Sequence, residues 1–477
     1  MRFGQPTQTH HPRLNSNASR LFAVSLGGVR PSPGAATFAR TKAPRSLNAF
    51  SALHLAAPEN GRAPSSCRRK PRRPIFFLSL AVLYCTLFFA TPAFAQTNVA
   101  TDKWQSLVAG RSLDLTILEP TAQTGNKPLP VVVYLKNLAA PRVGMESDEP
   151  ILRDLRNAGN LVVTLDYAHA TNAHVPFLNR DLGKLRDDFR AKKILPQSKF
   201  DDAHIFIVPE GCRLRRDVLY DGDTNRPLAL DIIYPSQPKQ PVGALIEFSC
   251  DNVNRMGNTS LSICSDTILD AAATEGFAIA MADHPVAPPY KGLDAMPACG
   301  QKIKAAVRTL RAEGAKLGLN GKIAPVGFSR GSGMALMLAT TEGMKEFEGH
   351  GENPGVSSAV QGAVVMSGRF TYLDLLPDDH MIPRYEKVWG IRTNNFEAWR
   401  QHGALDYLTN ATLPLFLTIN CSEAPDALHQ MTVLRKRLAE LGSDEIFLMD
   451  REPRGHKVTL DPEILGPMNT YLKQQLK

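Results

Sequence analysis

The stretch that decides the fold reads Lys322-Ile-Ala-Pro-Val-Gly-Phe-Ser-Arg-Gly331. The apolar run Lys322–Val326 predicts a buried strand, and the small and apolar residues of Ser332–Thr340 predict a helix. The two glycines of the turn between them relieve Cβ clashes, which lifts the Ser329 hydroxyl above the end of the strand. The backbone N–H of Arg330 then points at the place where a negative charge would develop. This pattern indicates a nucleophile; the alternative is a glycine-rich turn whose serine only caps the helix.

Strand-like and helix-like segments alternate around this turn. Strands are predicted at Leu228–Tyr234, Val242–Phe248, Phe277–Ala282, Val360–Met366, Leu413–Ile419 and Glu445–Met449, and helices at Asp266–Glu275, Gln301–Leu317 and Ala427–Leu441. Such alternation favours parallel βαβ units with helices on both faces. The sequence therefore predicts the α/β class, with a doubly wound, mostly parallel sheet.

A long, aromatic and irregular stretch separates two of these strands, at about 370–410. Its length is typical of an inserted cap over a site rather than of a core element. Its rings, Tyr385, Trp389, Phe396 and Trp399, would either stack on a substrate or form a small core of the cap itself.

A serine nucleophile needs a histidine that takes its proton and a carboxylate that orients the histidine. When the serine lies on such a turn, the chain order is serine, acid, histidine, each after a later strand. His456 follows the last predicted strand and is the candidate base. Glu423 and Asp426 both follow Leu413–Ile419; Glu423 is favoured because it lies closer to the strand end, and Asp426 is the alternative acid. The carboxylate that is not used would be a solvated loop residue or a helix cap.

An internal similarity precedes the catalytic segment. The stretch Arg111–Pro120 resembles Arg226–Pro235, and Ala158–Tyr167 resembles Glu275–His284, at offsets of 115 to 117 residues. A nearly constant offset favours a partial duplication, although two similar βαβ segments could also arise by chance. The first copy ends before anything like the serine turn. We therefore expect residues 96–212 to be an accessory α/β segment and residues 213–477 to be the catalytic domain.

The positive charge of the chain belongs to its first 95 residues. They carry +12 of the total of +9, so the remainder carries −3 and gives no electrostatic reason to expect binding to DNA or RNA. Basic residues from Arg68, the apolar run Ile75–Ala90 and Ala93-Phe-Ala95 predict a signal peptide over residues 68–95. We expect cleavage before Gln96, a periplasmic or extracellular protein and no stable membrane insertion; an uncleaved anchor is the alternative. Residues 1–67 would be a disordered leader that precedes the true start.

Five cysteines follow the expected cleavage site, so at least one thiol stays free. Cys250 and Cys264 are close enough in sequence to form a disulfide in an exported protein, or Cys250 is a buried strand-end thiol. No cysteine spacing is typical of a zinc site, and we expect neither a metal nor an organic cofactor.

From about Arg216 to Lys477 the chain resembles the α/β-hydrolase superfamily, and in it the secreted carbohydrate-esterase-like members related to acetyl xylan and feruloyl esterases. The serine turn, Leu405–Asn420 and Gln430–Gly442 carry this resemblance. It implies Ser329 as nucleophile, Glu423 as orienting acid and His456 as base. The usual His-Gly-Gly of the oxyanion loop is absent, which leaves the N–H of Cys250 or Asp251 as partner of the Arg330 N–H in an oxyanion hole.

The resemblance implies an exported serine hydrolase that cleaves carboxylic esters through an acyl-enzyme. Its substrate would be a small-molecule or polysaccharide ester, such as the ester decorations of plant polysaccharides. A serine peptidase of the prolyl-oligopeptidase type is one alternative, although no repeated propeller blades precede Arg216. A catalytically dead binding protein with the same fold is the other.

Overall fold

A computed structural model describes residues 99–477, except 108–109, 123–126, 138–147, 169–180, 182–183, 186, 190, 196–199, 223–226, 249–275, 286–295, 410–411 and 458–461. Several predictions fall outside the described residues: the leader 1–67, the signal peptide 68–95, the helix Asp266–Glu275, and Cys250, Asp251 and Cys264. Within the described part, no helix combines the length and the apolar character that crossing a bilayer requires.

Eight strands form the larger sheet, in the order β13-β12-β11-β10-β8-β9-β7-β6. Their bounds are β6 Cys212–Asp221, β7 Leu228–Pro235, β8 Val242–Phe248, β9 Ala278–Ala282, β10 Leu319–Phe328, β11 Ala363–Met366, β12 Leu415–Asn420 and β13 Glu445–Asp450. From β13 to β9 all neighbours are parallel, while β7 and β6 add an antiparallel edge. The sheet is therefore mostly parallel, as the alternation of segments predicts.

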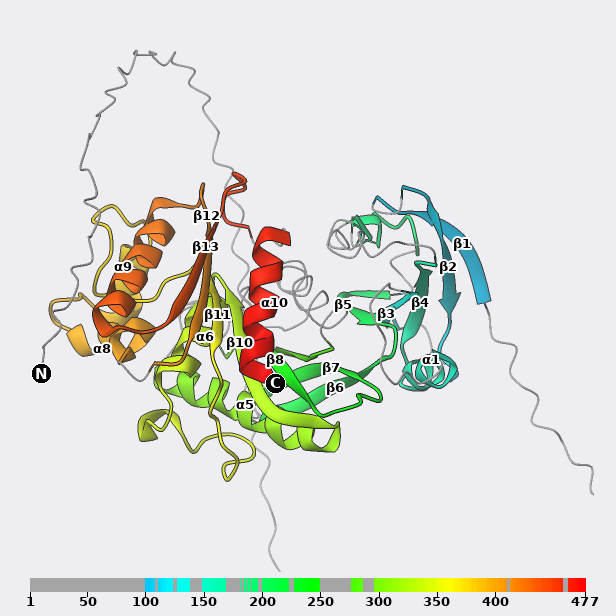
Figure 1. Cartoon of the computed structure of the whole chain (residues 1–477), viewed down its shortest axis with the longest axis horizontal. Coiled ribbons are helices and arrows are strands. Elements are labelled where there is room, and N and C mark those ends of the chain that lie inside the picture. The colour runs from blue at the N-terminus through cyan, green and yellow to red at the C-terminus, as the bar shows by residue number, and fades with distance from the viewer. Residues whose placement is uncertain are drawn as a thin grey trace, which may run out of the picture. The chain divides into compact units, whose positions relative to one another are not determined.

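Helices cover both faces of this sheet (Figure 1). Residues Leu245, Val364 and Phe416 share a buried cluster with α10 (Pro462–Leu476). Their chain neighbours Ile246, Val365 and Leu417 belong to a second cluster with α5 (Ala298–Lys316), α6 (Arg330–Thr340) and α9 (Pro425–Leu441). Successive residues of a strand point to opposite faces, so each strand feeds two cores, and the sheet is doubly wound.

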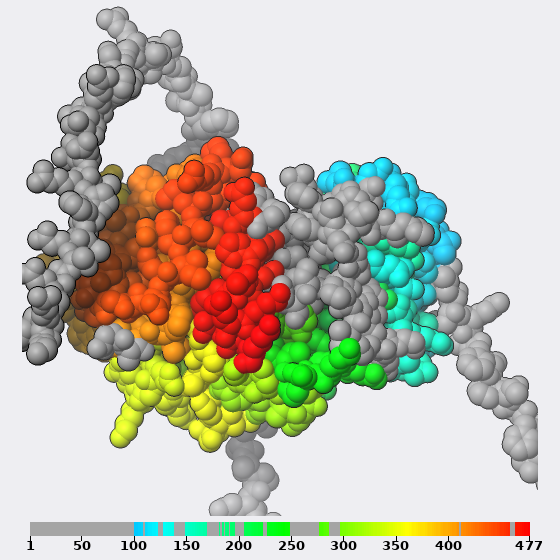
Figure 2. Space-filling view, viewed as in Figure 1, coloured from blue at the N-terminus to red at the C-terminus, as the bar shows by residue number. Residues whose placement is uncertain are grey.

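The helix α10 is an element that the sequence analysis did not predict. Its buried residues Ile464, Leu465, Met468, Tyr471 and Leu472 recur at helical spacing, so the pattern was readable. Pro467 lies inside it and disguises it, because proline normally interrupts a helix. Figure 2 shows α10, in red, running along the surface of the described part.

Five further strands form a second sheet, in the order β1-β2-β4-β3-β5. They are β1 Val99–Gln105, β2 Ser112–Leu118, β3 Leu129–Lys136, β4 Leu161–Asp166 and β5 Phe200–Pro209, and α1 (Asp148–Asn157) precedes β4. β1 and β2 pair antiparallel, as do β2 and β4, while β4-β3 and β3-β5 are parallel. The strands β6-β7-β9-β8-β10 of the larger sheet repeat this order and these directions.

The register of the two sheets agrees as well. Val163 of β4 pairs with Ile117 of β2 and Val133 of β3, and Ala280 of β9 pairs with Ile232 of β7 and Ile246 of β8. The offset between the two sets runs from 113 to 117 residues. The first five strands of each sheet therefore have the same topology, in the same register.

The stretch around 370–410 contains two short helices, α7 (Ile382–Trp389) and α8 (Phe396–His402), and the turn η4 (Ala404–Tyr407). Another 3₁₀ turn, η3 (Lys345–Phe347), follows α6. Three of the four rings singled out in the sequence pack on one another: Tyr385 stacks on Trp389 at 5.1 Å between centroids, and Trp399 meets Trp389 edge-on at 5.5 Å. Only Phe396 among them is exposed, so these rings mainly form a small core of their own.

Candidate active site

Ser329 lies between β10 and α6, at φ 54°, a left-handed conformation that is uncommon for a residue with a Cβ. A Cβ on Gly327 would lie 2.1 Å from the carbonyl oxygen of Gly331, and one on Gly331 would lie 2.5 Å from that of Phe248. Both glycines are therefore required by close backbone approach. The helix starts at Arg330, two residues earlier than predicted. The Ser329 side chain makes no capping hydrogen bond, which contradicts the alternative of a merely capping serine.

Three side chains from three segments meet at this turn. The Nε2 atom of His456 lies 2.9 Å from Ser329 Oγ, and its Nδ1 atom lies 2.9 Å from Glu423 Oε2. The Phe328 ring packs against the imidazole at 4.6 Å between centroids. The structure thus joins the three residues chosen as nucleophile, base and acid in one chain of contacts.

Glu423 lies three residues beyond β12 and is 5% exposed. Its Oε2 accepts a hydrogen bond from Ser367 Oγ at 2.6 Å, and its Oε1 accepts one from the Ala424 N–H at 2.9 Å. Burial alone would raise the pKa of this carboxyl, but the hydrogen bonds from His456, Ser367 and Ala424 hold it below its ordinary value. Glu423 is thereby kept ionised beside the imidazole.

Asp426, the alternative acid, has a different partner. It lies in the first turn of α9, and its carboxylate pairs with the guanidinium of Arg369. Arg369 also donates to Asp379, with NH2 3.0 Å from Oδ1. Although burial disfavours the guanidinium charge, the two carboxylates hold the pKa of Arg369 above its ordinary value. The structure therefore assigns Asp426 to an ion-pair network rather than to His456.

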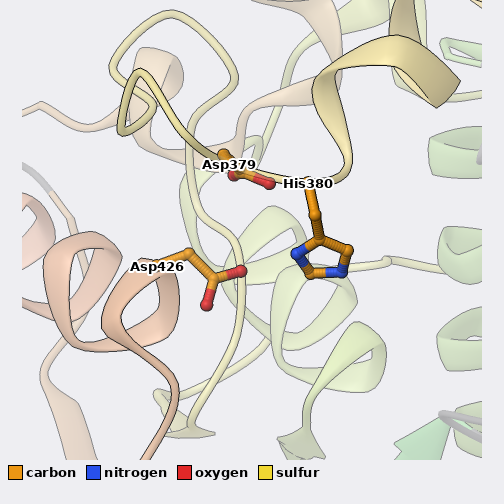
Figure 3. A group of neighbouring side chains, drawn as sticks. All are labelled: Asp379, His380 and Asp426. Carbon is orange, nitrogen blue, oxygen red and sulfur yellow. The ribbon is translucent and has the colours of Figure 1, made fainter. Parts of the chain in front are cut away.

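Figure 3 shows Asp379, His380 and Asp426 gathered close together. Each offers one atom that could ligate a metal, all within 4.8 Å of one another. The guanidinium of Arg369 pairs with both carboxylates and already supplies the positive charge that a cation would bring. This set of residues therefore fits an ion-pair network better than a metal centre.

A cavity of about 370 Å³ opens at Ser329 and His456. Apolar and aromatic side chains form part of its wall, among them Met334, Tyr372 and Tyr385, and the charged groups of Arg369 and Asp426 form another part. An apolar cavity with a few convergent polar groups is typical of a small-molecule site.

The oxyanion hole is described only in part. The N–H of Arg330 is the first of α6, where helix N–H groups lack intrahelical partners and the helix dipole favours negative charge. The other proposed donors, Cys250 and Asp251, lie outside the described residues. β8 ends at Phe248, against the serine turn, so the chain leaves it beside Gly331.

Sequence reasoning missed three residues of this site: Ser367, Arg369 and Asp379. A signal existed for Ser367 and Arg369, since they come directly after the predicted strand Val360–Met366, and ligand sites form at the carboxyl ends of parallel strands. No local pattern marks Asp379, because its partner Arg369 is ten residues away across an irregular stretch.

Known proteins share part of this chain. Residues 230–421 match the family model described as BD-FAE, an α/β-hydrolase-like domain. This match confirms the resemblance to α/β-hydrolase esterases. It includes Ser329 and ends two residues before Glu423.

Solved structures resemble the same part of the chain. A truncated carbohydrate esterase from gut microbiota is 18% identical with a TM-score of 0.47, over 55% of this chain and 95% of that one. A butyrate-bound esterase of Thermogutta terrifontis is 16% identical with a TM-score of 0.44, over 55% and 94%. An acetyl ester-xyloside bifunctional hydrolase from Caldicellulosiruptor lactoaceticus is 14% identical with a TM-score of 0.42, over 56% and 97%. The curated proteins give no match.

Proposed function

We propose that this protein is an exported serine hydrolase that cleaves carboxylic esters through an acyl-enzyme. The observation that carries the proposal is the unbroken chain of contacts from Ser329 through His456 to Glu423, at the edge of a cavity. The match to an α/β-hydrolase-like family supports it. A dead binding protein would have no need of all three contacts.

The acyl-enzyme route uses each of these contacts. Ser329 Oγ attacks the ester carbonyl carbon while His456 Nε2 takes its proton, and Glu423 stabilises the imidazolium that results. The N–H of Arg330 donates to the oxyanion. The tetrahedral intermediate then expels the alcohol, which receives the proton from His456. A water molecule, deprotonated by His456, releases the acid and restores Ser329.

We further propose that the substrates are ester decorations of plant polysaccharides. The resemblance to carbohydrate esterases suggested this substrate class, and the cavity wall is compatible with it. Tyr372 offers an aromatic face for a sugar or an acyl ring, while Arg369 and Asp426 offer donors and acceptors for hydroxyl groups. The segment 370–410 would be the cap of this cavity.

We also propose a division of labour along the chain. Residues 96–212 would be a partial duplicate of the hydrolase fold with an accessory role, which the shared strand order and register support. Residues 68–95 would be the signal peptide, so the mature protein would begin at Gln96 in the periplasm or outside the cell. Mass spectrometry of protein from the native cells tests this: peptides from before Arg68 would refute it.

A fluorophosphonate probe tests the serine mechanism directly. The wild-type protein should be labelled at Ser329, and Ser329→Ala should not be labelled. A panel of acetyl, feruloyl and long-chain aryl esters, with a matching anilide, then separates an esterase from a peptidase. Faster cleavage of the anilide than of its ester would contradict the proposed activity.

A further inference from the structure

Ser367 is the residue that the proposed mechanism has not yet used. It follows β11 directly, is 2% exposed and has a φ of 37°. This left-handed conformation is unfavourable for a residue with a Cβ, and unstrained glycine would be the ordinary choice. Strained residues of this kind gather at functional sites, where surrounding contacts hold them in place.

The hydroxyl of Ser367 touches the proposed acid at its working oxygen. Ser367 Oγ lies 2.6 Å from Glu423 Oε2, the same oxygen that lies 2.9 Å from His456 Nδ1. An ionised carboxylate only accepts hydrogen bonds, so the serine must be the donor. One carboxylate oxygen therefore receives two donors, one from the base and one from Ser367.

The backbone of Ser367 is fixed from two sides. Its N–H donates to the Thr418 carbonyl on β12 at 3.1 Å, and its own carbonyl accepts from Ser332 Oγ on α6 at 3.4 Å. A Cβ on the next residue, Gly368, would lie 2.6 Å from the Ser329 carbonyl oxygen. The turn at Ser367 thus lies directly against the serine turn and cannot move independently of it.

We propose that Ser367 is a positioning residue of the hydrolase: its hydroxyl fixes Glu423 Oε2 in line with His456 Nδ1 and stabilises the ionised carboxylate. The inference rests on the proposed function of the triad. It explains why a strained serine occupies a position where glycine would fit the backbone better. Ser367 acts through Glu423 and does not touch the reacting atoms.

Two variants remove the hydroxyl with opposite effects on the backbone. Ser367→Ala keeps the Cβ and the strain, whereas Ser367→Gly relieves the strain, so the glycine variant should fold even if the alanine variant does not. Both should be labelled by a fluorophosphonate about ten- to a hundredfold more slowly than the wild type, as expected for a lost hydrogen bond to a charged group. The labelling rate does not require the natural ester to be known.

The pH profile of labelling separates positioning from general damage. Without the Ser367 donor the Glu423 carboxylate is less stabilised, so the acid limb of the labelling rate should move to higher pH in both variants. A merely structural loss would lower the rate equally at every pH. Lys192→Gly is the matched control, since Lys192 also has a positive φ, 60°, and belongs to no part of the site; it should leave rate and profile unchanged.

Each outcome decides the inference. A folded Ser367→Gly variant with the wild-type rate and profile would overturn the role of Ser367 and leave the triad standing. A lower rate with an unshifted profile would also overturn it. A wild-type chain that the probe does not label would overturn the proposed function and this inference together.

Discussion

The two sheets share five strands in the same order, direction and register, yet only one carries the candidate site. They part at the end of the fifth strand. β10 runs through Ser329 into α6, whereas β5 runs through Glu210 and Gly211 directly into β6. By register Val208 corresponds to Val326, which places Gly211 at the position of Ser329.

Both positions have a positive φ, 75° at Gly211 and 54° at Ser329. The left-handed turn is therefore present in both copies, but only the second combines it with a nucleophilic side chain. The partners also differ: the Gly211 N–H donates to Tyr134 Oη at 2.9 Å, and the Ser329 N–H donates to the Met366 carbonyl at 3.1 Å. The acid and the base then come from beyond β12 and β13, which have no counterpart among the described strands of the smaller sheet. A βαβ frame can position a turn, but the chemistry depends on side chains that later strands bring to it.

The strongest test of this comparison removes the nucleophile. Ser329→Ala should lower kcat by roughly 10⁴-fold or more, and His456→Ala should match it within about tenfold, because members of one relay are not additive. Ester hydrolysis by purified variants measures both. Activity that survives Ser329→Ala and is lost on changing the smaller sheet would reverse the assignment of the two sheets.

A second test separates the two carboxylates that follow β12. Glu423→Gln should lower kcat by about 10²- to 10⁴-fold, since it removes the negative charge that holds His456. Asp426→Asn should lower it less than about tenfold, because Arg369 keeps Asp379 as its partner. Both changes replace a carboxylate by an amide of the same shape, so each controls the other. A larger loss for Asp426→Asn would make Asp426 the acid.

Much of this arrangement was readable in the sequence because it is local. The turn at Ser329 lies between a strand and a helix with clear periodicity, and Glu423 and His456 each follow a predicted strand. Contacts between distant segments were not readable. Neither the pairing of Ser367 with Glu423 nor that of Arg369 with Asp379 and Asp426 leaves a periodic trace, since each depends on how strand ends align in space.

The boundary errors have local causes. The helix α6 begins at Arg330 because the turn is tighter than a run of glycines suggests, and β11 begins at Ala363 rather than Val360. Gly362 has a φ of 157°, and a Cβ there would lie 2.3 Å from Tyr471 Oη, so a contact with α10 fixes where the strand starts. No propensity scale contains such a contact.

A third test exchanges the residues at the two equivalent turns. Ser329→Gly should raise the free energy of unfolding by about 1 kcal/mol relative to Ser329→Ala, since glycine tolerates a positive φ and alanine does not. Gly211→Ala should lower it by about 1 kcal/mol for the same reason. Urea unfolding at pH 7 measures both. Equal stabilities of the two Ser329 variants would mean that the serine turn is not strained and that the likeness of the turns is only formal.

The smallest expected effect compares one carboxylate from each sheet. Asp188, in the segment between β4 and β5, is buried, yet donors from Lys184, Lys193 and Trp104 hold its pKa below the ordinary 3.8. Glu423 is held below the ordinary 4.5 in the same way. A carboxyl whose pKa is lowered on folding stabilises the protein above its ordinary pKa, and that contribution is lost as the pH falls through the lower value.

The wild type should therefore lose stability below about pH 4.5, and Asp188→Asn and Glu423→Gln should each lose less between pH 7 and pH 3. Urea midpoints across this range measure the difference. Only Glu423→Gln should also change the pH profile of ester hydrolysis, because only Glu423 contacts the base. If Asp188→Asn shifted that profile as well, the smaller sheet would be coupled to the active site, and its description as a frame without chemistry would no longer hold.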